Sequence, residues 1–457
     1  MATQTLKCER HGELTRLTCV ECGTPICPKC AVRTEVGLKC ENDAQPDVQT
    51  PDVVFGGASS RRPLFLGLAG LAVVIVLGII VLASSGGGGG SSTPTTLAAV
   101  GTWTSAPDLA AIRGTTSAVV LKDGRVLVAG GSVGQIPLAA TEIFDPAAGQ
   151  WHPAGDLTAP RRGLAAVMLP DGRVLATGGR GEDGDPSAVA DIFDPASGKW
   201  TATGPMTKGR LGHSLTALAD GRVLAVGGTA IGLAPTGGTQ SVRPDASAEI
   251  FDPATGAWTP VASMATPRFE HTATLMADGK VLIAGGQGTN GLLASTEIYD
   301  PAVSAFIRSN DMTEARTNQA AVRLNDRSVL VVGGTGGPNG DVSLATAEVF
   351  DPNRGAWVRV GPLTEARTGE TATLLADGRV LVAGGESAVR GTRRSLASAE
   401  LYEPGRNAWR SANSMACPRS EQAAVLLGDG SVLVVAGDAA FPGQNPDPKG
   451  CADRYHP

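Results

Sequence analysis

Four pairs of potential metal ligands lie close together near the start of the 457-residue chain. The two members of each pair are separated by two residues, which lets both side chains converge on one tetrahedral ion. Thiolate and imidazole are the donors that Zn²⁺ prefers. The eight candidate ligands are Cys8, His11, Cys19, Cys22, Cys27, Cys30, Cys40 and Asp43. Because so short a segment has little apolar surface to bury, we expect zinc to supply the free energy that folds it.

This stretch resembles the B-box family of zinc fingers, in which eight ligands hold two zinc ions in a cross-brace. The resemblance implies that the first and third pairs share one ion and that the second and fourth pairs share the other. The last pair departs from the family, because Cys40 and Asp43 stand where histidines are usual. Sequential pairing of the first two pairs also fits the spacing. We predict one or two structural zinc ions within residues 1–45, with a disulfide cluster or incidental thiols as the competing interpretation.

A membrane segment is predicted next, because the twenty residues Leu64–Ala83 carry no charge. Their helical length of about 30 Å matches a bilayer core, and a buried soluble helix is the alternative. Arg61 and Arg62 precede the segment, and no further Lys or Arg follows until position 113. The positive-inside rule therefore places the N-terminus in the cytoplasm. Residues 46–63 are then a juxtamembrane linker, and the Gly/Ser/Thr-rich residues 84–97 are a flexible tether.

Beyond the tether, the sequence repeats itself about every 50 residues, a period typical of propeller blades. One unit runs from Arg268 through an Asp-Gly dipeptide and a double glycine to the segment 295–301. The dipeptide predicts a two-residue hairpin turn with positive φ angles. The apolar run after it predicts a strand buried on both faces, whereas the third segment alternates as a half-buried strand does. Seven such units predict an all-β domain.

An aromatic residue, usually tryptophan, opens the last strand of each unit. The double glycine followed by this aromatic resembles kelch repeats, and the resemblance implies that residues 98–457 form a seven-bladed kelch-type β-propeller. The last unit stops before its aromatic strand, so we expect the unmatched strand around Trp103 to close the ring. Cys417 and Cys451 both belong to this last unit. We expect them to form a disulfide outside the cytoplasm, with two free thiols as the alternative.

Residues that recur at one place in every unit are interpreted as structural. One arginine opens each unit, and His213 and His271 follow theirs by three positions. We expect all of these side chains to hold blades together. The arginines are Arg113, Arg161, Arg210, Arg268, Arg316, Arg367 and Arg419.

The three tyrosines, Tyr299, Tyr402 and Tyr455, occupy the slot that phenylalanine fills in other units, so we expect them in the core. This placement matters because the propeller also resembles that of galactose oxidase. That resemblance would require tyrosines, a cross-linked cysteine and histidines around a copper ion at the ring axis. No tyrosine or cysteine stands at a non-repeat position suited to that role, so copper chemistry is not implied.

Variable loops lie between the double glycine and the third strand of each unit, and recognition is usually built on such loops. The loop of the sixth unit carries Arg390, Arg393 and Arg394. We interpret these arginines as a basic contact for a ligand, with an ordinary solvated loop as the competing interpretation. The net charge of −6 gives no indication of a nucleic-acid partner.

Together these features predict a membrane-anchored interaction protein that is not an enzyme. Its extracytoplasmic propeller would bind a protein or glycan, and its cytoplasmic zinc finger would contact a partner protein. No nucleophile with a recognisable base, phosphate loop or paired carboxylates appears in the sequence. The alternative is a carbohydrate-active enzyme that uses the propeller axis.

Overall fold

The chain divides into two compact units, Met1–Ser92 and Thr93–Pro457. In the first unit, the computed structural model describes only the backbone of four short strands. In the second unit it describes residues 100–232, 241–389, 392–438 and 451–457.

Two antiparallel strand pairs make up the described part of the first unit. The pairs are β1 (Leu6–Lys7) with β2 (Leu14–Thr15), and β3 (Ala31–Thr34) with β4 (Gly37–Cys40). The first pair flanks the stretch of sequence that contains Cys8 and His11. The second pair begins directly after Cys30 and ends at Cys40, which is paired with Ala31. Of the eight predicted zinc ligands, Cys40 alone lies among the described residues.

No helix among the described residues is long and apolar enough to cross a bilayer. The predicted membrane segment, residues 64–83, lies outside the described part of the chain, as do the linker 46–63 and the tether 84–97.

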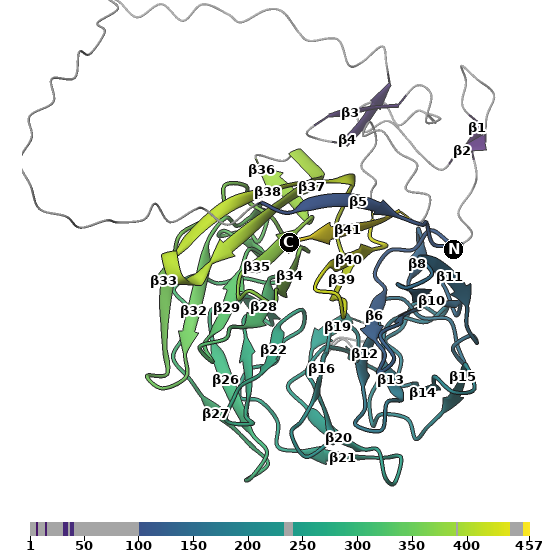
Figure 1. Cartoon of the computed structure of the whole chain (residues 1–457). Coiled ribbons are helices and arrows are strands. Elements are labelled where there is room, and N and C mark those ends of the chain that lie inside the picture. The colour runs from purple at the N-terminus through teal and green to yellow at the C-terminus, as the bar shows by residue number, and fades with distance from the viewer. Residues whose placement is uncertain are drawn as a thin grey trace, which may run out of the picture. The chain divides into compact units, whose positions relative to one another are not determined.

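The second unit is a seven-bladed β-propeller, which confirms the predicted fold (Figure 1). Each blade is an antiparallel sheet, and its first strand lines the centre of the ring. The seven first strands contact one another in sequence and close the circle. They are β6 (Ser117–Val120), β12 (Ala165–Met168), β16 (Ser214–Ala217), β22 (Thr272–Leu275), β28 (Ala320–Arg323), β34 (Thr371–Leu374) and β39 (Ala423–Leu426).

The second strand of every blade is buried along its whole length, as its continuous apolar sequence predicted. Neighbouring blades pack against both of its faces. The second strands are β7 (Val126–Ala129), β13 (Val174–Thr177), β17 (Val223–Val226), β23 (Val281–Ala284), β29 (Val329–Val332), β35 (Val380–Ala383) and β40 (Val432–Val435).

The third strands are more deeply buried than their alternating sequence predicted. An acid is enclosed by protein in every blade: it is the second residue of the third strand in six blades and Glu400, near the end of the longer third strand, in the sixth. The third strands are β10 (Thr141–Asp145), β14 (Ala190–Asp194), β20 (Ala248–Asp252), β26 (Thr296–Asp300), β32 (Ala347–Asp351), β37 (Thr392–Glu403) and β41 (Ala452–His456).

The fourth strands form the rim of the ring, and each packs its aromatic ring against an aromatic of the third strand, with centroids 4.9–5.2 Å apart. In the seventh blade this strand comes from the start of the domain, because Trp103 pairs with Tyr455. The predicted closure is thus confirmed. The fourth strands are β11 (Gln150–Pro153), β15 (Lys199–Ala202), β21 (Ala257–Val261), β27 (Ala305–Arg308), β33 (Ala356–Val360), β38 (Ala408–Arg419) and β5 (Thr102–Ala106).

The Asp-Gly turns differ from the predicted two-residue hairpins. Only the glycine has a positive φ, as at Gly124 (88°), while Asp123 accepts a hydrogen bond from the N–H of Arg125 at 3.1 Å. The Leu121 N–H donates to the Arg125 carbonyl and the Gly124 N–H to the Leu121 carbonyl, so the loop is a longer turn that ends in a bulge. In the fifth blade, Arg327 takes the glycine's place at φ 76°.

At the opposite end of the ring, the variable loops of five blades contain hairpins of their own. They are β8 (Ser132–Val133) with β9 (Ile136–Pro137), β18 (Thr229–Gly232) with β19 (Ser241–Pro244), β24 (Gln287–Gly288) with β25 (Gly291–Leu292), β30 (Thr335–Gly336) with β31 (Val342–Ser343), and β36 (Glu386–Val389) with the start of β37. We call this the loop end of the propeller.

Candidate functional site

One buried arginine per blade ties the first strand to the third. Arg316 Nη2 lies 3.2 Å from Glu348 Oε1, and both side chains are fully buried. Arg316 Nη1 also donates to the carbonyl oxygens of Gly333 (2.7 Å) and Thr346 (3.1 Å). Burial lowers the pKa of the arginine, and the nearby carboxylates partly offset this. The structural role predicted for these arginines is therefore confirmed.

The acidic partner recurs on the third strand of every blade, a signal that the sequence interpretation missed. The seven pairs are Arg113–Glu142, Arg161–Asp191, Arg210–Glu249, Arg268–Glu297, Arg316–Glu348, Arg367–Glu400 and Arg419–Asp453. A charge that is removed from water is stable only when it is paired and hydrogen-bonded. Each arginine–acid pair therefore holds the parts of its own blade together.

His213 and His271 lie between blades, as predicted. The Nε2 of His213 is 2.9 Å from Thr177 Oγ1 of the preceding blade, and that of His271 is 2.9 Å from Ser214 Oγ. Burial, helped by the arginine of the same blade, lowers the pKa of both to about 3. Both imidazoles are therefore neutral at physiological pH.

All three tyrosines of the chain lie in blade cores, as predicted. Tyr299 and Tyr455 are fully buried and Tyr402 is 2% exposed, each stacked on the aromatic of its blade's fourth strand. None of them reaches the axis, where the resemblance to galactose oxidase would require a tyrosine.

An axial ring surrounds the centre of the loop end. Its members are the second residues after the repeated arginines, and all have a left-handed φ between 48° and 65°. Backbone hydrogen bonds join neighbours: the Glu270 N–H donates to the Gly212 carbonyl at 2.8 Å, and the Asn318 N–H to the Glu270 carbonyl at 3.2 Å. The ring consists of Thr115, Gly163, Gly212, Glu270, Asn318, Gly369 and Glu421.

Four blades place a residue with a side chain in the axial ring although glycine suits this φ best. A non-glycine residue in this conformation costs on the order of 1–3 kcal/mol, and such strain is concentrated at functional sites. Two of the four side chains are carboxylates, Glu270 and Glu421. The sequence interpretation missed them because they belong to no motif. The signal in the sequence was the position two residues after the repeated arginine, where the residue type changes from unit to unit.

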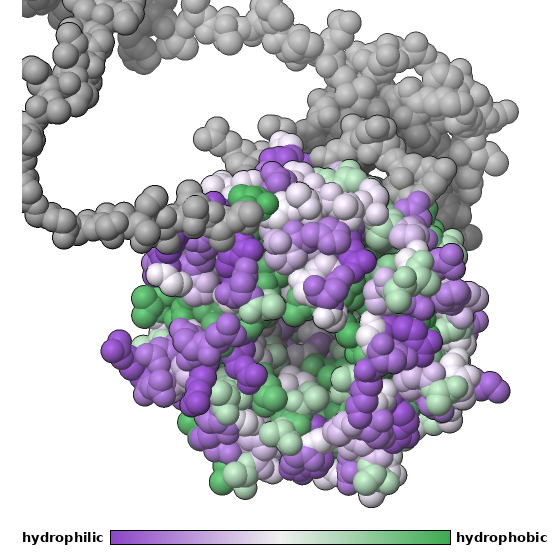
Figure 2. Space-filling model, viewed as in Figure 1, coloured by the Kyte–Doolittle hydropathy of each residue, from purple (hydrophilic) through white to green (hydrophobic). Residues whose placement is uncertain are grey.

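An outer cavity of about 290 Å³ opens at the loop end, and the space-filling view shows the middle of the ring hollowed (Figure 2). Its carboxylates are Glu270 and Glu421 of the axial ring, with Asp341 and Glu386 from the loops. No aromatic ring is among its lining residues in the described part of the chain. Four hydroxyl groups add to the polar wall, from Thr317, Thr335, Thr368 and Ser420.

An inner cavity of about 240 Å³ continues along the axis and shares the axial-ring wall with the outer one. Its other walls come from the third residue after the repeated arginine in four consecutive blades. These side chains are all at least nine-tenths buried. They are His271, Gln319, Glu370 and Gln422.

Burial raises the pKa of the axial carboxyl groups. The pKa of Glu370 is raised to about 8. Although Glu421 reaches solvent in the outer cavity, the surrounding protein displaces enough water to raise its pKa to about 7, with further contributions from Asp438, Glu270 and Glu386. The pKa of Glu270 is also raised by burial. At neutral pH, the Glu370 carboxyl group is therefore largely protonated and that of Glu421 about half protonated.

Two of the three predicted contact arginines are described, and both form ion pairs. Arg393 Nη1 lies 3.3 Å from Glu386 Oε1 at the wall of the outer cavity, and Arg394 pairs with Glu365. Both side chains remain more than half exposed. Arg390 lies outside the described residues.

Cys417 and Cys451 are joined by a disulfide, with their Cα atoms 6.7 Å apart. Cys417 lies on β38 of the sixth blade, and Cys451 directly precedes β41 of the seventh. The bond therefore links the two blades beside the point where β5 closes the ring.

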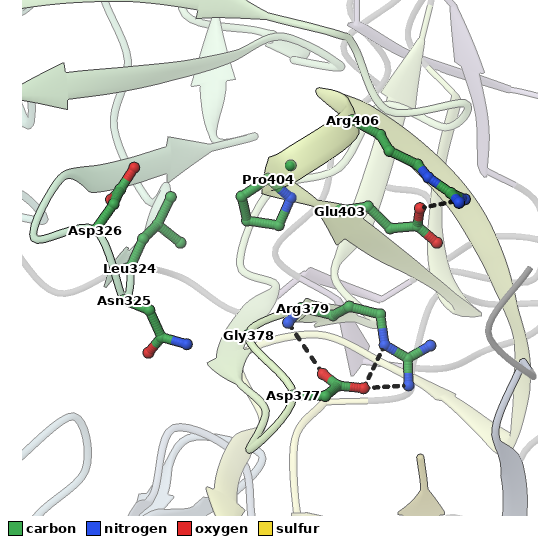
Figure 3. Close-up of a pocket in the computed structure, with 10 residues that line it drawn as sticks. Leu324, Asn325, Asp326, Asp377, Gly378, Arg379, Glu403, Pro404 and Arg406 are labelled. Atoms are coloured by element: carbon green, nitrogen blue, oxygen red, sulfur yellow. Dashed lines mark hydrogen bonds and ion pairs between the residues drawn. The ribbon is translucent and has the colours of Figure 1, made fainter. Parts of the chain in front are cut away.

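A separate pocket of about 580 Å³ lies at the other end of the propeller, between the turns of the fifth and sixth blades (Figure 3). Two of its three carboxylates form ion pairs within the protein. Asp377 pairs with Arg379, and Glu403 pairs with Arg406 (3.2 Å) and Arg410 (2.8 Å). We therefore regard the axial cavities as the better candidate site.

Comparisons with known proteins agree with this architecture. The model of the Kelch motif matches residues 113–158, 161–207, 236–265 and 316–364. No curated protein sequence matches the chain.

Among solved structures, 938 chains match, so likeness of fold alone does not select one activity. One of them is a fungal alcohol oxidase of the AA5 family in complex with copper. It is 19% identical, with a TM-score of 0.61 over 78% of this chain and 76% of the oxidase chain. The chain thus carries Kelch motifs on a seven-bladed β-propeller whose fold is similar to that of the oxidase.

Proposed function

We propose that the propeller binds a protein or glycan ligand through its axial cavities and that the protein is not an enzyme. The supporting observation is a contrast between the repeated frame of the propeller, meaning its strands and buried arginine–acid pairs, and its axis. The frame repeats in all seven blades, whereas the axial ring and the loops differ from blade to blade. A concave, polar site on a rigid scaffold is suited to recognition.

A cavity-filling substitution tests this proposal. Thr335 lines the outer cavity, so Thr335→Trp should block it, whereas Thr201→Trp on the exposed face of β15 adds the same bulk at the rim. The two full-length variants would be compared with the wild type on native membrane extracts and on a glycan array. We expect the ligands captured by the wild type to be retained by Thr201→Trp and lost by Thr335→Trp. Equal capture by both variants would contradict axial binding.

The proposed basic contact comprises Arg390, Arg393 and Arg394, and the two that are described, Arg393 and Arg394, lie at the same end of the propeller as the axial cavities. Because Arg393 pairs with Glu386 at the cavity wall, a ligand could exchange this ion pair for its own. Replacing the three arginines by alanine should change ligand capture. Unchanged capture would remove these residues from the binding surface.

The sequence also supports an anchored arrangement, in which residues 64–83 span a membrane and residues 1–45 bind one or two zinc ions on the cytoplasmic side. The zinc finger would contact a cytoplasmic partner protein. Elemental analysis of the reduced, metal-supplemented full-length chain should find zinc. The absence of zinc would count against the zinc finger. Recovery of the chain from the soluble fraction without detergent would count against the membrane segment.

A carbohydrate-active enzyme is the second candidate, and one observation favours it. A carboxyl group whose pKa is raised to about 7, as at Glu421, is suited to act as a general acid. Glycoside turnover by the full-length chain that disappears in Glu421→Gln would favour this candidate over a binding function.

A further inference from the structure

The axial cavities also indicate what kind of ligand they take. We propose that they bind a positively charged side chain, the guanidinium of arginine or the ammonium of lysine, presented by a protein ligand. This inference rests on the proposed function, because it names the ligand class of the same cavities.

The inner cavity offers hydrogen-bond acceptors whose donors are already used. Gln319 Nε2 donates to the Ala284 carbonyl at 2.8 Å, and Gln422 Nε2 donates to the Ala383 carbonyl at 2.7 Å. Each amide is thereby fixed with its Oε1 as the free end, and neither Oε1 has a partner in the protein. Both side chains are more than nine-tenths buried. An acceptor left unpaired in such a place costs about 1–3 kcal/mol, which a donor from a ligand would recover.

Glu370 adds a carboxyl group to the same wall. It is 7% exposed, and its Oε2 also lacks a partner. Its Oε1 lies 3.4 Å from the Ala320 N–H, a weak contact for a buried carboxylate. A cation in the cavity would donate to the unpartnered Oε2 and would stabilise the ionised form of this carboxyl group.

The outer cavity leads to this wall past further negative charge. Glu270 and Glu421 border both cavities. Among neighbouring charges, Glu386 is paired with Arg393, and Arg162 acts on both Glu421 and Asp438. Among the described residues, the acidic groups around the outer cavity outnumber these two arginines, so an anionic ligand is disfavoured and a cationic one is attracted.

The spacing of the carboxylates favours an extended organic cation over a metal ion. Within the described part of the chain, the only three His, Cys, Asp or Glu side chains close enough to share an ion are Cys417, Cys451 and Asp453, and the disulfide occupies that group's two sulfurs. An arginine carries five N–H donors spread over several atoms, and a lysine three, so either can reach acceptors on different blades. A neutral glycan would gain no charge attraction here, and the described residues that line the two cavities include no Phe, Trp or Tyr ring for it to stack on.

The test uses the full-length chain and matched peptides of the form acetyl-Gly-Gly-Xaa-Gly-Gly-amide, where Xaa is arginine, lysine, citrulline or glutamate. Citrulline keeps the shape of arginine without its charge. We expect the arginine or lysine peptide to bind at least tenfold more tightly than the citrulline and glutamate peptides by calorimetry. The double variant Glu270→Gln/Glu421→Gln should weaken that binding at least tenfold. Glu182→Gln, at an exposed loop residue that lines neither cavity, should leave it unchanged.

Equal affinity for arginine and citrulline peptides would overturn the inference, and so would basic peptides that bind the double variant as well as the wild type. Thermal unfolding of each variant shows whether it is folded. If neutral peptides or glycans bind and Thr335→Trp blocks them, the proposed function stands and the cationic ligand is wrong. If no probe binds at a site that Thr335→Trp blocks, both are wrong.

Discussion

The buried arginine pairs allow a quantitative test of what holds a blade together. In Arg316→Met, the buried Glu348 loses its counter-charge, and the carbonyls of Gly333 and Thr346 lose a donor. Glu348 keeps only the hydrogen bond that its Oε2 accepts from the Thr313 N–H at 2.8 Å. Removing one partner of a buried pair costs about 3–5 kcal/mol, because the remaining charge is left desolvated. We therefore expect the free energy of unfolding to fall by about that amount.

A double-mutant cycle separates the pair from its surroundings. Glu348→Gln alone removes the fully buried partner of Arg316 but leaves Glu314 at 3.7 Å, so it should cost less, about 1–3 kcal/mol. The double variant Arg316→Met/Glu348→Gln contains no unpaired charge, so its loss should be well below the sum of the two single losses. As a matched control, Arg308 pairs with Asp311 at 3.2 Å with side chains that are 73% and 41% exposed. Arg308→Met should change stability by no more than about 0.5 kcal/mol.

Urea unfolding of the full-length variants, followed by tryptophan fluorescence, measures these differences. A loss below about 1 kcal/mol in Arg316→Met would refute the reasoning, because a fully buried charge left unpaired cannot be that cheap. If the losses of the two single variants add up in the double variant, the two side chains act independently. That result would contradict the coupling expected from their 3.2 Å contact.

Three further predictions concern closure, pH and the disulfide. Trp103→Ala removes the ring stacked on Tyr455 and the indole N–H that donates to the Ala412 carbonyl at 2.8 Å. We expect the free energy of unfolding to fall by about 2–3 kcal/mol and proteolysis ahead of β6 to become faster. As the control, Trp258→Ala in an uninterrupted blade should destabilise the protein without exposing that cleavage site. Because burial raises the pKa of Glu370 to about 8, the stability of the wild type relative to Glu370→Gln should be greatest below pH 4.5 and should decline as pH rises through 8. The urea midpoint is measured at pH 5 and pH 8.5 for each protein. The same change in midpoint in both proteins would contradict this prediction. Breaking the Cys417–Cys451 bond by Cys417→Ser/Cys451→Ser should lower stability by about 2–4 kcal/mol, and mass spectrometry without reductant should find neither thiol free in the wild type.

Repetition is what made the fold readable from sequence. Seven copies of one strand pattern fix the number of blades, and the mismatch between the two ends of the domain fixes how the ring closes at Trp103 and Tyr455. Repetition also identified structural residues, since an arginine or a tyrosine slot that recurs in every unit serves the frame. The prediction that the third strand is half buried was wrong, because its alternating sequence does not show that its acid pairs with a buried arginine of the same blade.

The candidate site depended on the tertiary structure for the opposite reason. Glu270, Glu370 and Glu421 lie in three different blades at positions that vary between units, so no motif joins them in sequence. Closing the ring brings these positions to one axis, where all three line a shared cavity. The sequence by itself determined a repeated frame, because each blade is built from local pairings. Only closure of that frame decided which of the unrepeated side chains would meet.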